Sequence, residues 1–412
     1  MPLYTSSKFA SAGASGADWR EAAKAVLETL EGSKTKDKNF NFGFLYITDR
    51  LADDAQSIVN LFSSVLQIKN WVGAVGIGIC AVGEEFVDRP AISVMLGRFD
   101  ESDFCVFPPA GIDMSDAEEA LFPFLDKNDP MLIFVHGDSS AGEDPVQTLK
   151  ALNAVTNGFM VGGLSSSRGM HVQFSGSGEC SGGVSGVAFT QAIPVASTLS
   201  QGCTAIGMPH VITLCDEDEI IELDGKRAVE VFEDDLRSMA IKKIERDPDT
   251  VLIDEDALED EDAVPEEFKD LFRGEVHAAF PVPESDQEDY LVRNIREIDP
   301  ESGSITVAHQ VMQGERVMFV HRNDKSVRED LSLKLLALRE RVGRDTGAFE
   351  PKGGLYISCI SRAFSDNGGG MQGEMALVRD IIGDVPLAGF YAGGEVCNAR
   401  LYGYTGILVL FL

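Results

Sequence analysis

Hydrophobic and polar positions along this chain repeat one pattern three times. In the first copy, apolar runs at Phe42–Thr48, Val72–Ile79 and Ala91–Leu96 predict three strands, the second of them rich in glycine. Between the first two strands, apolar residues recur at helical spacing: Ile58, Leu61, Phe62, Val65 and Leu66. The copy therefore consists of a strand, a polar loop, a helix, a strand, a turn and a strand.

The other two copies share this pattern more than they share sequence. The strands predicted for the second copy are Met131–Val135, Phe159–Gly163 and Gly186–Phe189. The strands predicted for the third copy are Leu355–Ile360, Val385–Tyr391 and Thr405–Leu412. Repeated β-α-β-β units of this kind predict an α/β fold, here a layered α/β sandwich.

Different material precedes the first copy and separates the second from the third. A helix capped by Asp18 is predicted over Trp19–Leu30. A hairpin at Val211–Leu214 and Ile220–Leu223 leads into a helix with Val229 on its apolar face. An antiparallel meander and a last helix then open the C-terminal part, at Tyr290–Ile295, Ser304–His309, Arg316–His321 and Arg328–Val342.

The net charge of the chain limits the classes of molecule that it can bind. The 412 residues carry a net charge of −32 with 44% hydrophobic residues, so a large core and an acidic surface are expected. Such a surface repels phosphate backbones and anionic headgroups, which argues against nucleic-acid binding. A third of the charge lies in residues 245–270, predicted to be an acidic insertion or linker. Calcium binding there ranks lower, because the segment lacks the alternating ligands and central glycine of an EF-hand loop.

Sequence features that are missing predict a cytoplasmic protein without a cofactor. No apolar run reaches the roughly 18 residues of a membrane-spanning helix, and Met1–Trp19 does not have the shape of a signal peptide. Seven cysteines without a CxxC pair are typical of reduced thiols in the cytoplasm. The P-loop, GxSxG and HExxH motifs are missing and the six histidines are scattered, so neither a cofactor nor a metal site is expected.

The strongest candidate site lies in the third copy. Cys359 and Arg362 follow its first strand, and Glu395 follows its second strand. If these strands are parallel, their carboxyl ends meet at one edge, where α/β sheets bind ligands. Arg362 would then pair with a ligand carboxylate and Glu395 with a ligand ammonium, or the two would satisfy each other. The candidate ligand-binding residues are Cys359, Arg362, Tyr391, Gly394, Glu395 and Tyr404.

Weaker candidates lie elsewhere. Gly163 belongs to the segment Gly162–Ser167, which predicts either an anion cradle or a tight turn. Cys203 beside a glycine and Arg293 in the meander are further candidates, each with an ordinary structural role as the alternative. His136 with Asp138 offers a base and an orienting acid, although an ordinary polar loop explains them better.

Together these segments resemble the FIST family over most of the chain, with a FIST N-like module at 1–225 and a FIST C-like module at 226–412. One departure is Tyr402, where the family often has histidine. The segments that carry the resemblance are Val75–Glu84, Met160–Leu164, Ser200–Gly207, Glu222–Ala228, Tyr290–Ile295, Asp299–Gly303, Cys359–Arg362, Val385–Glu395 and Gly403–Thr405.

The resemblance implies a sensory protein of signal transduction that binds a small ligand, with amino acids among the ligands to expect. A separate signalling protein would then receive the signal. Two alternatives remain open. One is a cysteine-dependent hydrolase that uses Cys203 or Cys359. The other is a ligand-free scaffold whose acidic segment 245–270 docks a basic partner.

Overall fold

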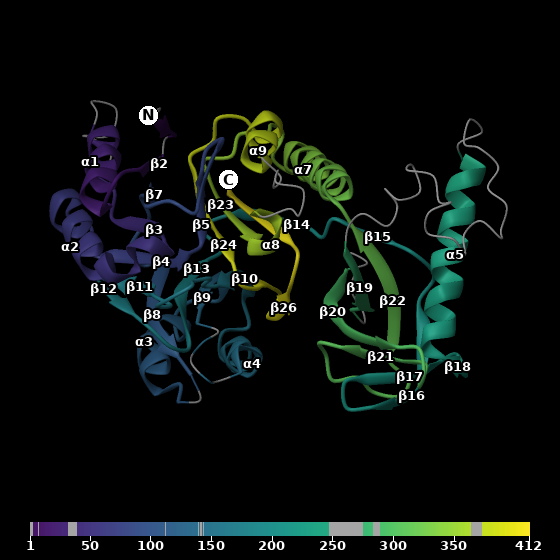
Figure 1. The fold of residues 1–412 in the computed structure, drawn as a ribbon. Coiled ribbons are helices and arrows are strands. Elements are labelled where there is room, and N and C mark those ends of the chain that lie inside the picture. The colour runs from purple at the N-terminus through teal and green to yellow at the C-terminus, as the bar shows by residue number, and fades with distance from the viewer. Residues whose placement is uncertain are drawn as a thin grey trace. The chain divides into compact units, whose positions relative to one another are not determined.

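The chain divides into two compact units in a computed structural model (Figure 1). Unit 1 contains Met1–Ser200 and Leu331–Leu412, and unit 2 contains Gln201–Asp330. The predicted module boundary at residue 225 therefore falls inside unit 2, and most of the predicted acidic segment, from 247 on, lies outside the described residues. The structure describes residues 3–6, 8–31, 39–111, 113–138, 140, 142, 144–246, 275–282, 289–363 and 373–412.

Unit 1 contains the three predicted copies, and each is longer than its sequence pattern indicates. Every copy runs strand, helix, strand, helix, strand, hairpin, strand. Copy 1 comprises β2 (Phe9–Ser15), α1 (Trp19–Leu30), β3 (Phe42–Thr48), α2 (Ala55–Leu66), β4 (Asn70–Gly76), the hairpin β5 (Gly78–Ala81) and β6 (Glu84–Val87), and β7 (Ala91–Gly97). Copy 2 comprises β8 (Phe104–Ala110), α3 (Ser115–Leu125), β9 (Pro130–Gly137), α4 (Pro145–Thr156), β10 (Phe159–Leu164), the hairpin β11 (Gln173–Gly176) and β12 (Gly178–Cys180), and β13 (Val184–Thr190).

Copy 3 follows the same order, but unit 2 is inserted after its first strand and ends within its first helix. This insertion explains why the third copy looks distant from the second in sequence. Its elements are β14 (Val195–Ser200), α7 (Asp324–Thr346), β23 (Gly353–Cys359), α8 (Ile360–Ala363), α9 (Glu374–Ile382), β24 (Leu387–Ala392), the hairpin β25 (Glu395–Cys397) and β26 (Arg400–Tyr402), and β27 (Gly406–Phe411).

The copies exchange their hairpins in a cycle. Within each copy, the two strands that flank the second helix are parallel, and the last strand pairs antiparallel on the other side. The hairpin of copy 1 joins the sheet of copy 3, the hairpin of copy 2 joins the sheet of copy 1, and the hairpin of copy 3 joins the sheet of copy 2. Each of the three sheets described in unit 1 therefore contains strands from two copies.

A glycine recurs at the same place in all three parallel pairs. A Cβ atom added to Gly73, Gly162 or Gly389 would lie 1.7–1.8 Å from a carbonyl oxygen of the paired strand. No real Cβ approaches so closely, so only glycine permits this strand spacing. The shared position confirms that the three copies are structurally equivalent.

The three sheets of unit 1 meet around an aromatic core. We number the sheets by the copy that supplies most of their strands, as sheets 1, 2 and 3. Phe44 of sheet 1 lies 6.0 Å from Phe134 of sheet 2 and 6.1 Å from Phe411 of sheet 3, measured between ring centroids. Helices cover the outer faces, as α1 and α2 do over sheet 1 with apolar residues such as Val26 and Phe62 (Figure 1). The architecture is the predicted layered α/β fold.

Two strand predictions need correction. The run Val72–Ile79 is not one strand, because β4 ends at Gly76 and β5 starts at Gly78 in a different sheet. The glycines let the backbone leave one sheet and enter the next. The strand that ends at Cys359 does not extend further, since Ile360–Ala363 forms a helical turn.

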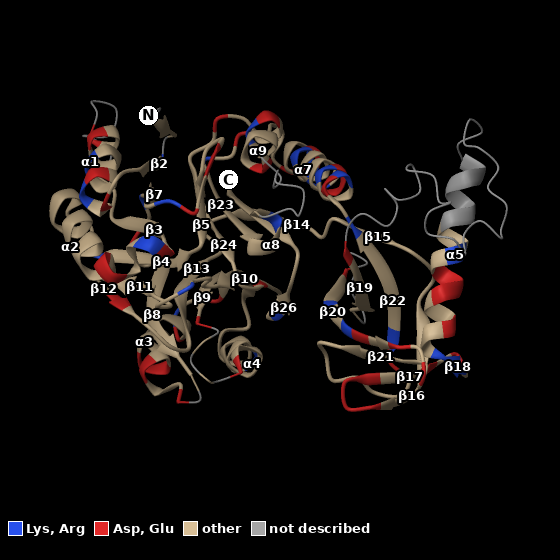
Figure 2. Cartoon of the chain, in the orientation of Figure 1, with Lys and Arg blue, Asp and Glu red and all other residues tan. Residues whose placement is uncertain are grey.

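Unit 2 is an antiparallel sheet whose pairings close on themselves, with α5 packed against it. Phe232 of α5 contacts Phe319 of β22 at 4.6 Å between ring centroids. The last strand of the predicted meander, β22, pairs with β15, β16 and β19 rather than with β21. Acidic residues lie along the described part of α5 and at the β16–β17 turn (Figure 2). The elements are β15 (Cys203–Ala205), β16 (His210–Asp216), β17 (Glu219–Leu223), β18 (Lys226–Arg227), α5 (Ala228–Arg246), β19 (Glu275–Pro281), β20 (Tyr290–Asp299), β21 (Ser304–Val307) and β22 (Arg316–Arg322).

An imidazole bridge in unit 2 predicts a pH-dependent stability. His210 Nδ1 lies 2.7 Å from Asp224 and its Nε2 lies 3.0 Å from Asp235 of α5. Burial lowers the pKa of His210, but the two carboxylates outweigh it and raise the pKa above its ordinary value. The stabilisation that this bridge gives is complete below about pH 6.5, the pKa of His210 in the unfolded chain. It is lost as pH rises through the higher pKa of His210 in the folded chain. We expect the urea midpoint to fall over that interval in the wild type, and to fall less in His210→Gln; equal falls would contradict the bridge.

Candidate functional site

The candidate residues of the third copy gather where β23 and β24 end. The two strands are parallel, so Cys359 at the end of β23 and Tyr391 near the end of β24 lie at one edge. Glu395 opens β25 in the neighbouring sheet, where it pairs with Gly163 of β10. We call this cluster the copy-3 mouth, comprising Cys359, Arg362, Tyr391, Gly394, Glu395 and Tyr404.

Gly163 joins this mouth although sequence analysis placed it in another module. The exchanged hairpin brings it there, because Leu164 N donates to Gly394 O at 2.8 Å and Gly393 N donates to Leu164 O at 2.9 Å. A Cβ at Gly163 would lie 2.8 Å from Ala392 Cβ. The loop after β10 and the turn after β24 are therefore packed backbone against backbone. The other weaker candidates, Cys203 and Arg293, belong to unit 2.

Arg362 is buried, and its partner is a residue that sequence analysis missed. Its Nε and Nη2 donate to Glu374 Oε1 at 2.8 and 2.7 Å, and both side chains are at most 1% exposed. Tyr356 donates its hydroxyl to the same oxygen at 2.7 Å, and Ser358 donates to Oε2 at 3.0 Å. Glu374 is the first residue of α9 and follows a glycine-rich stretch, which is the only sequence signal that could have indicated it.

Glu395 is also buried, but it lacks an ion-pair partner among the described residues. Thr405 donates to Oε2 through its backbone N at 3.0 Å and through its hydroxyl at 2.8 Å. Oε1 is buried without a hydrogen-bond partner that meets normal geometry. Burial raises the pKa of Glu395 to about 8, against the opposing effects of Thr405, Arg362 and Cys359.

A single peptide group connects Arg362 and Glu395. Arg362 Nη1 donates to Tyr404 O at 3.4 Å, while the next nitrogen, Thr405 N, donates to Glu395. Tyr404 has a φ of 66°, a left-handed conformation that costs a non-glycine residue energy. The two charged side chains therefore do not satisfy each other by an ion pair, the alternative considered from sequence; Glu374 takes that place for Arg362.

The thiol of Cys359 faces this carboxyl group. Its Sγ lies 2.9 Å from Ser361 Oγ, so the two side chains meet across a helical turn rather than along an extended strand. Burial, with the nearby Glu395 charge, raises the pKa of Cys359 to about 12. The thiol is therefore neutral near pH 7.

The equivalent edge of copy 2 holds a second polar cluster. Ser165 Oγ lies 2.8 Å from His171 Nδ1, and the same nitrogen lies 3.9 Å from Asp138 Oδ1. Both neighbours share one ring nitrogen, so the imidazole does not relay between them as in a hydrolase triad. His136, the base proposed with Asp138, instead lies in the core with its Nε2 3.2 Å from Tyr46 OH, and burial lowers its pKa to about 3.

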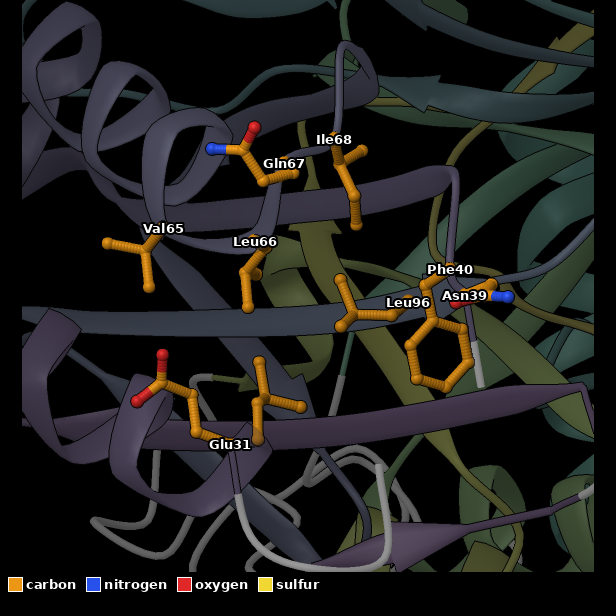
Figure 3. Close-up of a pocket in the computed structure, with 9 residues that line it drawn as sticks. Glu31, Asn39, Phe40, Val65, Leu66, Gln67, Ile68 and Leu96 are labelled. Atoms are coloured by element: carbon orange, nitrogen blue, oxygen red, sulfur yellow. The ribbon is translucent and has the colours of Figure 1, made fainter. Parts of the chain in front are cut away.

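A cavity of about 570 Å³ lies at the opposite, amino-terminal end of sheet 1 (Figure 3). Six of its nine lining residues are apolar, among them Phe40, Leu66 and Ile68, and its exposed lining surface is polar and apolar in equal parts. Its polar residues Glu31, Asn39 and Gln67 are exposed. None of the candidates from the sequence lines it.

The described part of the chain contains neither a cluster of metal ligands nor a helix that could span a membrane. No group of three or more histidine, cysteine or carboxylate side chains there is placed to hold a metal ion. Among the same residues, no helix combines the length and apolarity needed to cross a bilayer.

Two family models together match most of the chain. Residues 41–226 match the model of the FIST N domain, and residues 253–398 match that of the FIST C domain. An uncharacterized protein of Mycobacterium tuberculosis (strain ATCC 25618 / H37Rv) is 29% identical over 220 residues, which is 52% of this chain and 50% of the relative. An uncharacterized protein of Mycobacterium bovis is 28% identical over 219 residues, with the same coverage. The chain thus spans about half the length of the curated relatives it matches.

Proposed function

We propose that this chain, which belongs to the FIST family of sensory domains in signal transduction, binds a small metabolite at the copy-3 mouth. Amino acids and related small molecules are the class to test first. The observation that carries this proposal is Glu395 Oε1, a fully buried oxygen that lies near the Cys359 thiol and has no hydrogen-bond partner of normal geometry among the described residues. An unsatisfied buried polar group is costly, and a ligand atom would satisfy it.

Strain and packing at the mouth support the same proposal. Tyr404 keeps a left-handed backbone there, and such strain concentrates at functional sites. The exchanged hairpin builds the mouth from copies 2 and 3, so a ligand at this place contacts two sheets at once. Binding there would alter how the two sheets pack, and this change is the physical basis that we propose for the signal.

Thermal unfolding in the presence of single metabolites tests the proposal. A ligand at about 100 times its Kd should stabilise the wild type by about 2.7 kcal/mol. We expect Glu395→Leu to fold, because copy 1 has the apolar Ile79 at the equivalent position. It should abolish the gain, because leucine cannot form a hydrogen bond with a ligand. The control is Asp138→Asn, at the equivalent edge of copy 2, which should retain the stabilisation by the ligand. A gain that survives Glu395→Leu would move the ligand away from this mouth.

The second candidate, a cysteine-dependent hydrolase, predicts a reactive thiol, and burial opposes it. Burial raises the pKa of Cys80, Cys105, Cys180 and Cys359, in the last two cases to about 11 and about 12. We expect iodoacetamide to modify Cys359 at neutral pH far more slowly than free cysteine, and to modify it readily in urea. Rapid labelling of Cys359 in the folded protein, read by mass spectrometry, would favour the enzyme.

The output of the sensor is part of the proposal. We propose that a separate signalling protein reads the bound state, and that the protein acts in the cytoplasm, where its seven free cysteines would stay reduced. The scaffold alternative predicts that deleting residues 245–270 abolishes capture of a basic partner. Ligand-dependent capture by the deletion variant would instead support the sensor.

A further inference from the structure

The three copies place three different side chains at the position of Glu395. Gly73, Gly162 and Gly389 are the glycines that lie against a carbonyl oxygen of the paired strand. On each exchanged hairpin, one residue pairs with the residue that directly follows one of these glycines. Glu395 pairs with Gly163, Gln173 pairs with Ala74, and Ile79 pairs with Phe390. All three side chains are fully buried. The fold therefore accommodates a neutral polar or an apolar group here and does not require a charge.

Gln173 shows how a neutral side chain satisfies this position. Its Oε1 accepts two hydrogen bonds from Ser185, from the backbone N at 3.1 Å and from the hydroxyl. Its Nε2 donates to Gly182 O at 3.1 Å. One atom of the amide thus accepts twice, and the other donates.

Glu395 reproduces the accepting half of this arrangement. Oε2 accepts twice from Thr405, through the backbone N and the hydroxyl, as Gln173 Oε1 does from Ser185. Oε1 therefore corresponds to the amide nitrogen, which is a donor. With both donors of Thr405 on Oε2, a proton on the carboxyl group belongs on Oε1.

The surroundings of Glu395 favour a protonated acid. The titratable groups that act on it are the Cys359 thiol of β23 and the Arg362 guanidinium of α8, and the residue paired with it on β26 is Tyr402. Arg362 is bound to Glu374, and no basic side chain among the described residues lies within ion-pair distance of Glu395. A buried carboxyl group without a cation is most stable when neutral.

We infer that Glu395 acts as a neutral acid whose Oε1–H donates to the ligand, so that the ligand presents an acceptor oxygen of a carboxylate or carbonyl group. This inference rests on the proposed function and reverses the role expected from sequence, in which Glu395 bound an ammonium group. The ligand class becomes the organic acids, with or without an amino group. Buried acids held neutral to donate a hydrogen bond are known chemistry in enzymes.

The protonation of Glu395 can be measured without any ligand. The infrared carbonyl band of a protonated carboxyl group should be present in the wild type near neutral pH and disappear as pH rises above about 8. Glu395→Gln should lack that component. A wild-type spectrum identical to that of Glu395→Gln near neutral pH would show an ionised Glu395 and overturn the inference.

Three matched probes then test the ligand class, with thermal stabilisation as the readout. Propionate, ethylamine and L-alanine offer a carboxylate alone, an ammonium alone and both. We expect propionate and L-alanine to stabilise the wild type at about pH 6.5, and ethylamine not to. Propionate affinity should fall about tenfold by about pH 9, because the acid is then largely ionised. Glu395→Gln keeps a donor and should bind propionate without this pH dependence.

The outcomes separate the two proposals. Ethylamine binding that Glu395→Gln abolishes would overturn the acceptor class while leaving a ligand site at this mouth. A response to none of the three probes, in a protein that shows the protonated carboxyl band, would count against the proposed function and against the acceptor role with it.

Discussion

Replacing Arg362 with methionine will lower the free energy of unfolding by about 3–5 kcal/mol, because Glu374 is then left as a buried charge without its partner. Both side chains are at most 1% exposed, and two guanidinium nitrogens hold one carboxylate oxygen. Tyr356 and Ser358 still donate to Glu374, but neither neutralises it. Urea unfolding of the full chain measures the loss.

Two matched variants make this result interpretable. Arg362→Met combined with Glu374→Gln removes both charges and should recover most of the loss, since the glutamine oxygen can accept from one of the hydroxyls of Tyr356 and Ser358 and its amide nitrogen can donate to the other. Lys24→Met breaks an exposed pair with Glu28 and should cost less than about 1 kcal/mol. A loss of similar size for Arg362→Met and Lys24→Met would mean that the buried pair is not structural. Truncating Arg362 alone is therefore a poor test of ligand binding.

The wild type will lose stability relative to Glu395→Gln as pH rises. The folded pKa of Glu395 is raised to about 8, above an unfolded value near 4.3, so its contribution is complete below the unfolded pKa and is lost as pH rises through the folded one. The difference between the two proteins should change by up to about 1.4 kcal/mol per pH unit in that window. Urea unfolding at several pH values measures it.

Asp138→Asn provides the opposite control. Burial tends to raise the pKa of Asp138, but hydrogen bonds from Ser140 and Gly182 lower it overall. Its stabilisation is present above the unfolded pKa of about 3.9 and is lost only at lower pH. The difference between wild type and Asp138→Asn should therefore stay flat from about pH 5 to 8. A flat difference for Glu395→Gln as well would show that Glu395 titrates normally.

Local patterns predicted the elements of unit 1 well, but not their partners. Hydrophobic periodicity placed strands at Phe42–Thr48 and Phe159–Gly163 within one residue of their observed ends. It merged β4 and β5 into one strand, because both are short, apolar and rich in glycine. Which sheet a hairpin joins depends on contacts between distant residues, and no local periodicity encodes such contacts.

The part of the site that follows from the geometry of parallel strands could be predicted from the sequence. Parallel strands bring their carboxyl ends together, and this brought Cys359, Arg362 and Tyr391 to one edge. Gly163 lies at the same mouth only because of the exchanged hairpin. Glu374 was missed because an ion pair across a loop follows no fixed spacing, and the sequence assigned Arg362 to a ligand instead.

The exchange of hairpins also constrains how this protein can be made. While the ribosome has produced only copies 1 and 2, the edge of β10 lacks its neighbour β25, and sheet 3 does not yet exist for the hairpin β5–β6 to join. Unpaired strand edges are aggregation hazards, and pairing between distant segments is slow. Newly synthesised chains should therefore depend on chaperones until copy 3 emerges. A single copy, expressed alone, would lack a strand that only another copy can supply.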